Sequence, residues 1–238
     1  MKVKVLKIQN ININFKKSLK AKNISIKIKP FEGVFVTVPR FLSFQIAEDF
    51  VVSKMKWINK NLTKIQSQEK LQTNFNIGTI FRTRFHSIYI NSTLLTNNSF
   101  IKENEYVEIY ISENRRIQSL ENQIYIRNVV KETWRSEAKS YLPNKVDELA
   151  IKHNFTYKKL AIKNTKTRWG SCSFSNNINL SLHLMRLSED LIDYVILHEL
   201  VHTKVKNHSK EFWTTLEKHC PNSKNLDREL KKTSLGIF

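Results

Sequence analysis

The chain has 238 residues, 40% of them hydrophobic and 26% charged, which are the proportions of a soluble globular protein with a sizeable core. Its 40 Lys and Arg against 21 Asp and Glu give a formal net charge of +19, but the lysines are spread over the whole chain and argue only weakly for nucleic acid. The sequence has no apolar run of membrane-spanning length, no signal-peptide apolar region and only 2 cysteines, so we expect a cytoplasmic protein without membrane attachment or disulfide framework.

The N-terminal part of the chain predicts strands and one helix. Residues 23–29 and 34–38 alternate apolar and polar side chains around a connection with Pro and Gly, which predicts a β-hairpin. Apolar residues at spacings of three and four then predict an amphipathic helix from Ser43 to about Gln68. Alternation returns in three further predicted strands, at residues 77–82, 87–90 and 106–111.

A charged segment at residues 113–116 precedes a long predicted helix over 117–153, in which Pro143 marks a kink or a second start. We place a domain boundary here, with a β-rich N-terminal region at residues 1–114 and a core domain at residues 115–238. Strands are expected in the core domain at residues 159–162, 168–173 and 178–184.

The strongest motif is His198-Glu199-Leu200-Val201-His202, on a helix predicted to begin at Ser188. Two histidines four residues apart share one face of a helix, so both imidazoles can bind a single cation beside the intervening carboxylate. The residues around the motif are almost all apolar, and burying such polar groups is costly unless they are paired or bind a metal. These features raise the motif above a chance match.

A third ligand follows at His208. Asn207 is expected to reverse the chain in a left-handed conformation, and Ser209 to cap a new helix starting at Lys210. Three protein ligands leave one tetrahedral position for water, which is typical of catalytic rather than structural zinc. The sequence therefore predicts a zinc site, or a site for another divalent cation, formed by His198, His202 and His208.

Several of these segments together resemble the YgjP-like metallohydrolases, which are zinc-dependent, peptidase-like proteins related to the SprT-like and other minimal zincins. The resemblance rests on specific C-terminal motifs and covers nearly the whole chain. It is carried by residues 168–172 (RWGSC), the 193–195 lead into the HExxH motif, 207–209 (NHS) and 212–213 (FW), and more loosely by residues 24–26, 38–40 and 56–58.

The resemblance implies an α+β fold: a β-rich N-terminal region, then a zincin-like core in which an antiparallel sheet packs on the HExxH helix. It also implies that Glu199 is the catalytic carboxylate and that residues 169–172 form a strand beside the substrate cleft. The cleft candidates are Arg168, Trp169, Gly170, Ser171, His183 and Tyr194. Arg168, His183 and Tyr194 are also the candidates for stabilising a substrate oxyanion, although His183 and Trp169 are equally consistent with packing.

The expected function is a zinc-dependent metallopeptidase in which the metal activates water and Glu199 is the general base. One alternative is a metal-dependent nucleoside triphosphate pyrophosphatase, with lysines attracting the nucleotide. A second alternative is a basic nucleic-acid-binding module with a structural metal, against which the open three-histidine set argues. A peptide, protein or nucleotide substrate is thus expected, and the oligomeric state is left open.

Overall fold

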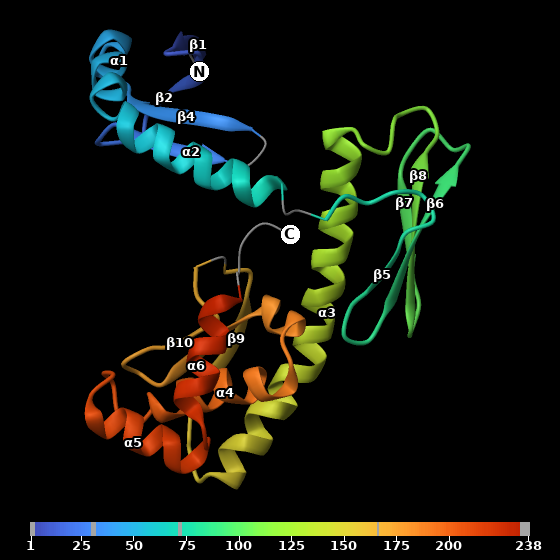
Figure 1. The fold of residues 1–238 in the computed structure, drawn as a ribbon, viewed down its shortest axis with the longest axis vertical. Coiled ribbons are helices and arrows are strands. Elements are labelled where there is room, and N and C mark those ends of the chain that lie inside the picture. Colours follow the sequence, from blue (N-terminus) through green and yellow to red (C-terminus); the bar gives the residue numbers. More distant parts are fainter. Residues whose placement is uncertain (1–2, 30–31, 71–72, 166, 234–238) are drawn as a thin grey trace. The chain divides into compact units, whose positions relative to one another are not determined.

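The computed structural model describes residues 3–29, 32–70, 73–165 and 167–233, with only the backbone described at 66 and 68–70. It divides into two compact units, Met1–Thr73 and Asn74–Gly236 (Figure 1). The content of strands and helices confirms the α+β class. The division falls earlier than the boundary expected after residue 114, because the strands of residues 80–112 contact the long helix that follows them. No helix in the described ranges is both long and apolar enough to cross a membrane.

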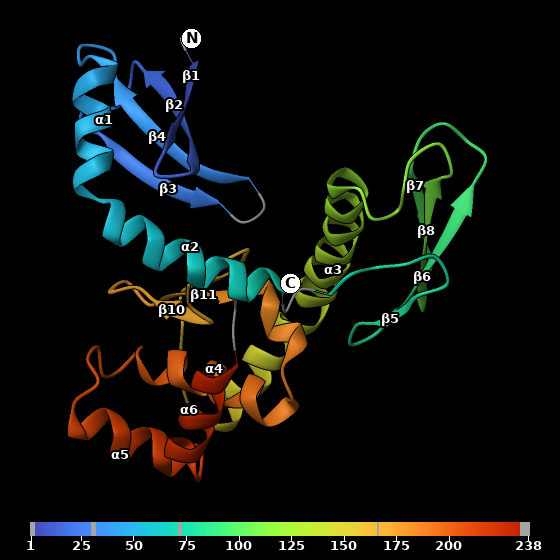
Figure 2. The same ribbon diagram turned by 45° about the horizontal axis from the view of Figure 1, so that its top comes forward.

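The first unit is a four-stranded sheet covered by two helices (Figure 2). Its elements are β1 (Val3–Ile8), β2 (Ile11–Ser18), β3 (Ser25–Lys29), β4 (Gly33–Pro39), α1 (Phe44–Ser53) and α2 (Met55–Lys70). The strand order is β1-β2-β4-β3, with β2 and β4 parallel and the outer strands antiparallel. The predicted hairpin is therefore β3–β4. Alternate residues such as Phe15 and Val36 are buried against the helices because successive side chains of a strand point to opposite faces.

The single helix predicted over residues 43–68 is two helices. Ser43 caps the first one as expected, accepting a hydrogen bond from the Ile46 N–H at 3.2 Å. The helix ends at Ser53, whose hydroxyl donates back to the Phe50 carbonyl at 2.7 Å, and Lys54 leaves helical geometry. A serine hydroxyl near a helix end competes in this way for backbone groups, and apolar spacing does not reveal it.

The second unit begins with another four-stranded sheet and a long helix. Its elements are β5 (Ile80–Arg82), β6 (Ser87–Thr93), β7 (Ser99–Lys102), β8 (Tyr106–Ser112) and α3 (Leu120–Lys152). The order β5-β6-β8-β7, with β6 and β8 parallel, repeats the topology of the first sheet. Helix α3 continues through Pro143. Its buried Glu137 accepts hydrogen bonds from the Phe85 N–H at 3.0 Å and His86 Nδ1 at 2.8 Å, which attaches the β5–β6 turn to α3.

The remaining elements build the C-terminal part of this unit. They are β9 (Lys159–Lys163), β10 (Gly170–Cys172), β11 (Asn177–Ser181), the 3₁₀ helix η1 (Leu182–Arg186), α4 (Glu189–Val201), α5 (Lys210–His219) and α6 (Ser223–Lys232). The strand order is β10-β11-β9. The sheet is mixed rather than antiparallel, because β9 runs parallel to β11. Alternation predicts the two faces of a strand but not the direction of its neighbour.

His183 lies in η1 and not in the predicted strand. Strand β11 ends at Ser181, whose hydroxyl accepts a hydrogen bond from the His183 N–H at 3.3 Å and so starts the short helix. A serine at this position favours a helical turn over continued strand.

Candidate metal centre

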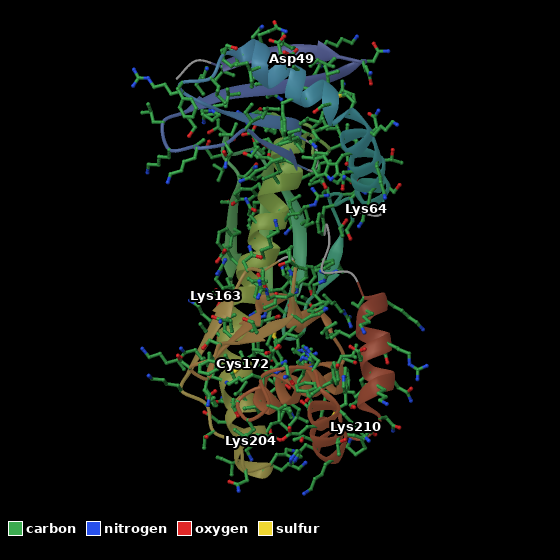
Figure 3. All side chains as sticks on the ribbon, turned by 90° about the vertical axis from the view of Figure 1, so that its left-hand side faces the viewer. Asp49, Lys64, Lys163, Cys172, Lys204 and Lys210 are labelled. Atoms are coloured by element: carbon green, nitrogen blue, oxygen red, sulfur yellow. The ribbon has the colours of Figure 1, made fainter. Side chains whose placement is uncertain are left out.

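Helix α4 carries the HExxH motif and is buried along most of its length, where it contacts α3, β10, β11, α5 and α6. Because neighbouring elements cover α4 on several sides, it has no polar face. This explains its nearly unbroken apolar sequence. Figure 3 shows the side chains of this unit, with Cys172 of β10 and Lys204 of the segment after α4 labelled as guides. Glu199 and His202 are buried and His198 is half-buried.

The imidazoles of three histidines meet at one point. His208 Nε2 lies 3.0 Å from His198 Nε2 and 3.2 Å from His202 Nε2. Ligand nitrogens that each lie about 2.0–2.1 Å from zinc in tetrahedral geometry are about 3.3 Å apart, so these nitrogens have the spacing of a tetrahedral ligand set. Among the described residues, the three histidines form a group of side chains whose ligand atoms could hold a metal ion.

The far nitrogens of the two helix histidines have hydrogen-bond partners that fix the rings. His202 Nδ1 donates to the Val205 carbonyl at 2.9 Å. His198 Nδ1 lies 3.5 Å from the Tyr194 hydroxyl, which itself donates to Asp227 Oδ1 at 3.2 Å. With each Nδ1 acting as a donor, both Nε2 atoms present lone pairs to His208. His208 can donate to only one of them, and a cation satisfies all three nitrogens.

The chain returns His208 to the end of α4 through a short turn. Asn207 is not left-handed as expected; its side chain accepts a hydrogen bond from the Ser209 N–H at 3.2 Å. Ser209 caps α5 as predicted, accepting from the Phe212 N–H at 3.4 Å. The fully buried Phe212 ring then lies 4.9, 4.5 and 4.8 Å, between centroids, from His198, His202 and His208. One aromatic ring thus supports all three imidazoles.

Glu199 faces Gly170 of strand β10. A Cβ atom at Gly170 would lie 2.6 Å from Glu199 Oε1, 2.7 Å from its Cγ and 2.9 Å from its Cδ. Only glycine leaves room for this carboxylate. Glu199 Oε2 is buried and accepts no hydrogen bond in the described part of the chain. A buried carboxylate oxygen without a donor fits a site where a metal ion and water would be present.

The electrostatics of the cluster are those of desolvated groups. Burial lowers the pKa of His198 to about 3, assisted by repulsion from His202 and His208, and burial also lowers the pKa of His202. The imidazoles of His198 and His202 are therefore neutral at pH 7, as metal ligands must be. Burial raises the pKa of Glu199 to about 8, with Arg168 opposing the shift. A divalent cation beside Glu199 would favour its charged form.

The other predicted cleft residues lie in different surroundings. Arg168 is exposed and lies within electrostatic reach of Glu199. Trp169 and Ser171 are half-buried beside and on β10, where the Trp169 carbonyl accepts from the Ser181 N–H at 2.8 Å. His183 is buried, with Nε2 3.0 Å from Asn164 Oδ1 and its ring against Trp134 of α3.

The roles of Asp227 and Phe212 beside the cluster are not predicted from the sequence. Tyr194 is predicted as a cleft candidate, but its hydroxyl contacts the far nitrogen of His198 and the side chain is 1% exposed. Its partner Asp227 lies on α6, 33 residues further along the chain. The sequence around Asp227, an acidic residue on a basic helix, does not indicate such a contact. Phe212 was noted only as part of a motif.

Comparison with known families identifies the class of this protein. The family model that matches residues 22–233 describes a metallopeptidase domain, so the chain is a metal-dependent hydrolase. It belongs to the YgjP-like family. Comparison with curated proteins gives no match.

Two solved structures of metallopeptidase zymogens are similar to part of the chain. Jannalysin of Methanocaldococcus jannaschii is 27% identical over 38% of this chain and 93% of its own, with a TM-score of 0.34. Abylysin of Pyrococcus abyssi is 24% identical over 40% of this chain and 98% of its own, with a TM-score of 0.35.

The contact between Gly170 and Glu199 predicts a selective loss of activity in Gly170→Ala. The added methyl group displaces the carboxylate, and displacement of a catalytic group by about 1 Å can lower a rate about 100-fold. Metal content, measured by elemental mass spectrometry, should stay unchanged because the histidines are not touched. Ile151→Ala, at an exposed position near the end of α3, is the control and should keep its peptide hydrolysis rate. Full activity in Gly170→Ala would contradict the assigned contact.

The Asp227–Tyr194–His198 chain predicts that Asp227→Asn weakens metal binding about 10- to 100-fold, the usual effect of removing a group that orients a ligand. The measurement is a competition titration of the metal-free protein against a chelator. Glu229→Gln removes the same charge from an exposed position of α6 and should bind metal like the wild type. Equal affinities of the two variants would exclude a specific role of Asp227.

Proposed function

We propose that this chain is a zinc peptidase in which His198, His202 and His208 hold the metal and Glu199 is the general base. The observation that carries the proposal is the convergence of three Nε2 atoms, with His208 Nε2 3.0 and 3.2 Å from the other two, beside a buried carboxylate oxygen that accepts no hydrogen bond from the described residues. Imidazole suits zinc among the available divalent ions, and three ligands leave a position open for chemistry. Membership of a metallopeptidase family supports the same conclusion.

Glu199 is the residue that moves protons in this mechanism. A bound zinc ion supplies Lewis acidity, which increases the acidity of water and polarises a substrate carbonyl. The buried carboxylate of Glu199, in the charged form that a bound cation would favour, takes a proton from the attacking water. The protonated Glu199 then donates that proton to the amine of the leaving peptide. Gly170 allows the carboxylate to stay close to strand β10 during both transfers.

The proposed substrate is an extended peptide that pairs with β10. This strand is at the edge of its sheet: β11 pairs with one side, and no strand of the described residues pairs with the other. Free backbone N–H and C=O groups on an edge can bind a peptide as an added strand. Arg168, exposed at the start of this segment and within electrostatic reach of Glu199, is the candidate for stabilising the oxyanion.

The comparisons support neither alternative from the sequence, a nucleotide pyrophosphatase or a nucleic-acid-binding module with a structural metal. Structural zinc sites are closed by four protein ligands, and this cluster has three histidines and a carboxylate packed against glycine. A peptide substrate is therefore preferred. Screening unstructured peptides against nucleoside triphosphates with one enzyme preparation distinguishes the two enzymatic functions.

Glu199→Gln is expected to keep about one metal ion per chain and to lose peptide hydrolysis by about 10²- to 10⁴-fold, because glutamine fits the same space but cannot accept the proton. Elemental mass spectrometry and a peptide cleavage assay measure the two properties. Glu211→Gln, an exposed position in the first turn of α5, is the matched control and should remain active. A Glu199→Gln enzyme as fast as wild type would overturn the general-base role.

A further inference from the structure

A second pair of histidines lies outside the three-histidine cluster. His153 is the C-terminal cap of α3, and His219 is the last residue of α5. Their Nδ1 atoms are 3.2 Å apart although the residues are 66 positions apart in the chain. The rings meet edge to face, with centroids 5.2 Å apart and an interplanar angle of 87°. Both side chains are half-buried.

The separation of the two nitrogens equals that within the candidate metal centre. There the corresponding distances are 3.0 and 3.2 Å, and two nitrogens of a tetrahedral zinc site lie about 3.3 Å apart. The pair can also share one hydrogen, with one imidazole donating to the other. A shared hydrogen requires that one ring carries its hydrogen on Nδ1 and the other does not. A cation instead accepts lone pairs from the Nδ1 atoms of both rings.

The surroundings of the pair favour neutral imidazoles and a cation between them. Both histidines terminate helices, and the C-terminal ends of α3 and α5 carry partial negative charge. The carboxylate of Asp193 likewise favours positive charge at His153. Its Oδ1 is buried without a hydrogen-bond partner in the described part of the chain. Burial, more than any other factor, lowers the pKa of both histidines.

Three lysines oppose a bound cation, namely Lys152, Lys204 and Lys218. Lys204, labelled in Figure 3, donates to the Asn154 carbonyl at 3.0 Å and lies 4.5 Å from the centre of the Phe155 ring. Its ammonium is therefore already bound to other groups. Lys152 and Lys218 are exposed, where repulsion is screened by water and salt. Direct coordination by two imidazoles is short-range and is not screened in this way.

We propose that His153 and His219 form a second metal site, which takes a divalent transition-metal ion of the kind that imidazole prefers, such as Zn²⁺ or Ni²⁺. Water completes its coordination. The ion joins the ends of α3 and α5, and α5 carries the Phe212 ring that supports the three ligand histidines. The second site shares no residue with the first, so each can be removed separately.

The experiment is equilibrium dialysis of metal-free protein against Zn²⁺, followed by elemental mass spectrometry. Wild type should bind about two zinc ions per chain at saturation, the second more weakly, because it has two protein ligands instead of three. His219→Phe removes a ligand but keeps an aromatic ring against Phe155, and it should bind about one. His202→Ala should keep the weaker zinc ion, so failure of the candidate metal centre is distinguished from failure of the second site.

His153→Gln is the second variant; it removes the other imidazole ligand and should also lose the weaker ion. In His202→Ala protein, saturating Zn²⁺ should raise the thermal unfolding temperature, and adding His153→Gln should abolish this increase. One zinc ion per chain in wild type and His219→Phe alike would overturn the proposal and leave the histidines as a hydrogen-bonded pair. Two ions in both proteins would place the second ion elsewhere and overturn it equally.

Discussion

Two imidazoles and a carboxylate are buried on a helix whose other residues are almost all apolar, and this constraint determines how α4 is surrounded. A buried polar group without partners costs about 2–7 kcal/mol, and a buried charge costs more. His202 reduces that cost with a hydrogen bond to Val205, and His198 with Tyr194. His208 can donate to only one of the two inward-facing Nε2 atoms, and Glu199 Oε2 accepts no hydrogen bond from the described residues. A divalent cation with a water would satisfy these atoms together.

Each element around α4 contributes one part of this arrangement. Strand β10 contributes Gly170, whose missing side chain makes room for Glu199. The turn before α5 contributes His208, and α5 contributes the Phe212 ring against all three imidazoles. Helix α6 contributes Asp227, which acts through Tyr194. No strand of the described residues pairs with the outer edge of β10, which leaves this edge available to the extended peptide that we propose as the substrate.

The sequence predicted the parts of the site that depend on local geometry. Helix periodicity brings His198 and His202 to one face, and the cap at Ser209 explains the return of His208. Alternation and helical spacing predict the individual strands and helices, and the resemblance to the YgjP-like family implies the α+β class. The parallel pairing of β9 with β11 and the end of α1 at Ser53 depend on strand direction and on one side-chain hydrogen bond. Apolar patterns contain no information about either.

The central claim is that three histidines form one metal site, and the most direct test is the metal content of the purified protein after supply of zinc. The account predicts about one tightly bound zinc ion per wild-type chain, and none bound tightly by His202→Ala. Circular dichroism of the variant shows whether its fold is retained. A folded wild-type protein that binds no metal tightly, or a His202→Ala protein that binds it as tightly as wild type, would contradict the account.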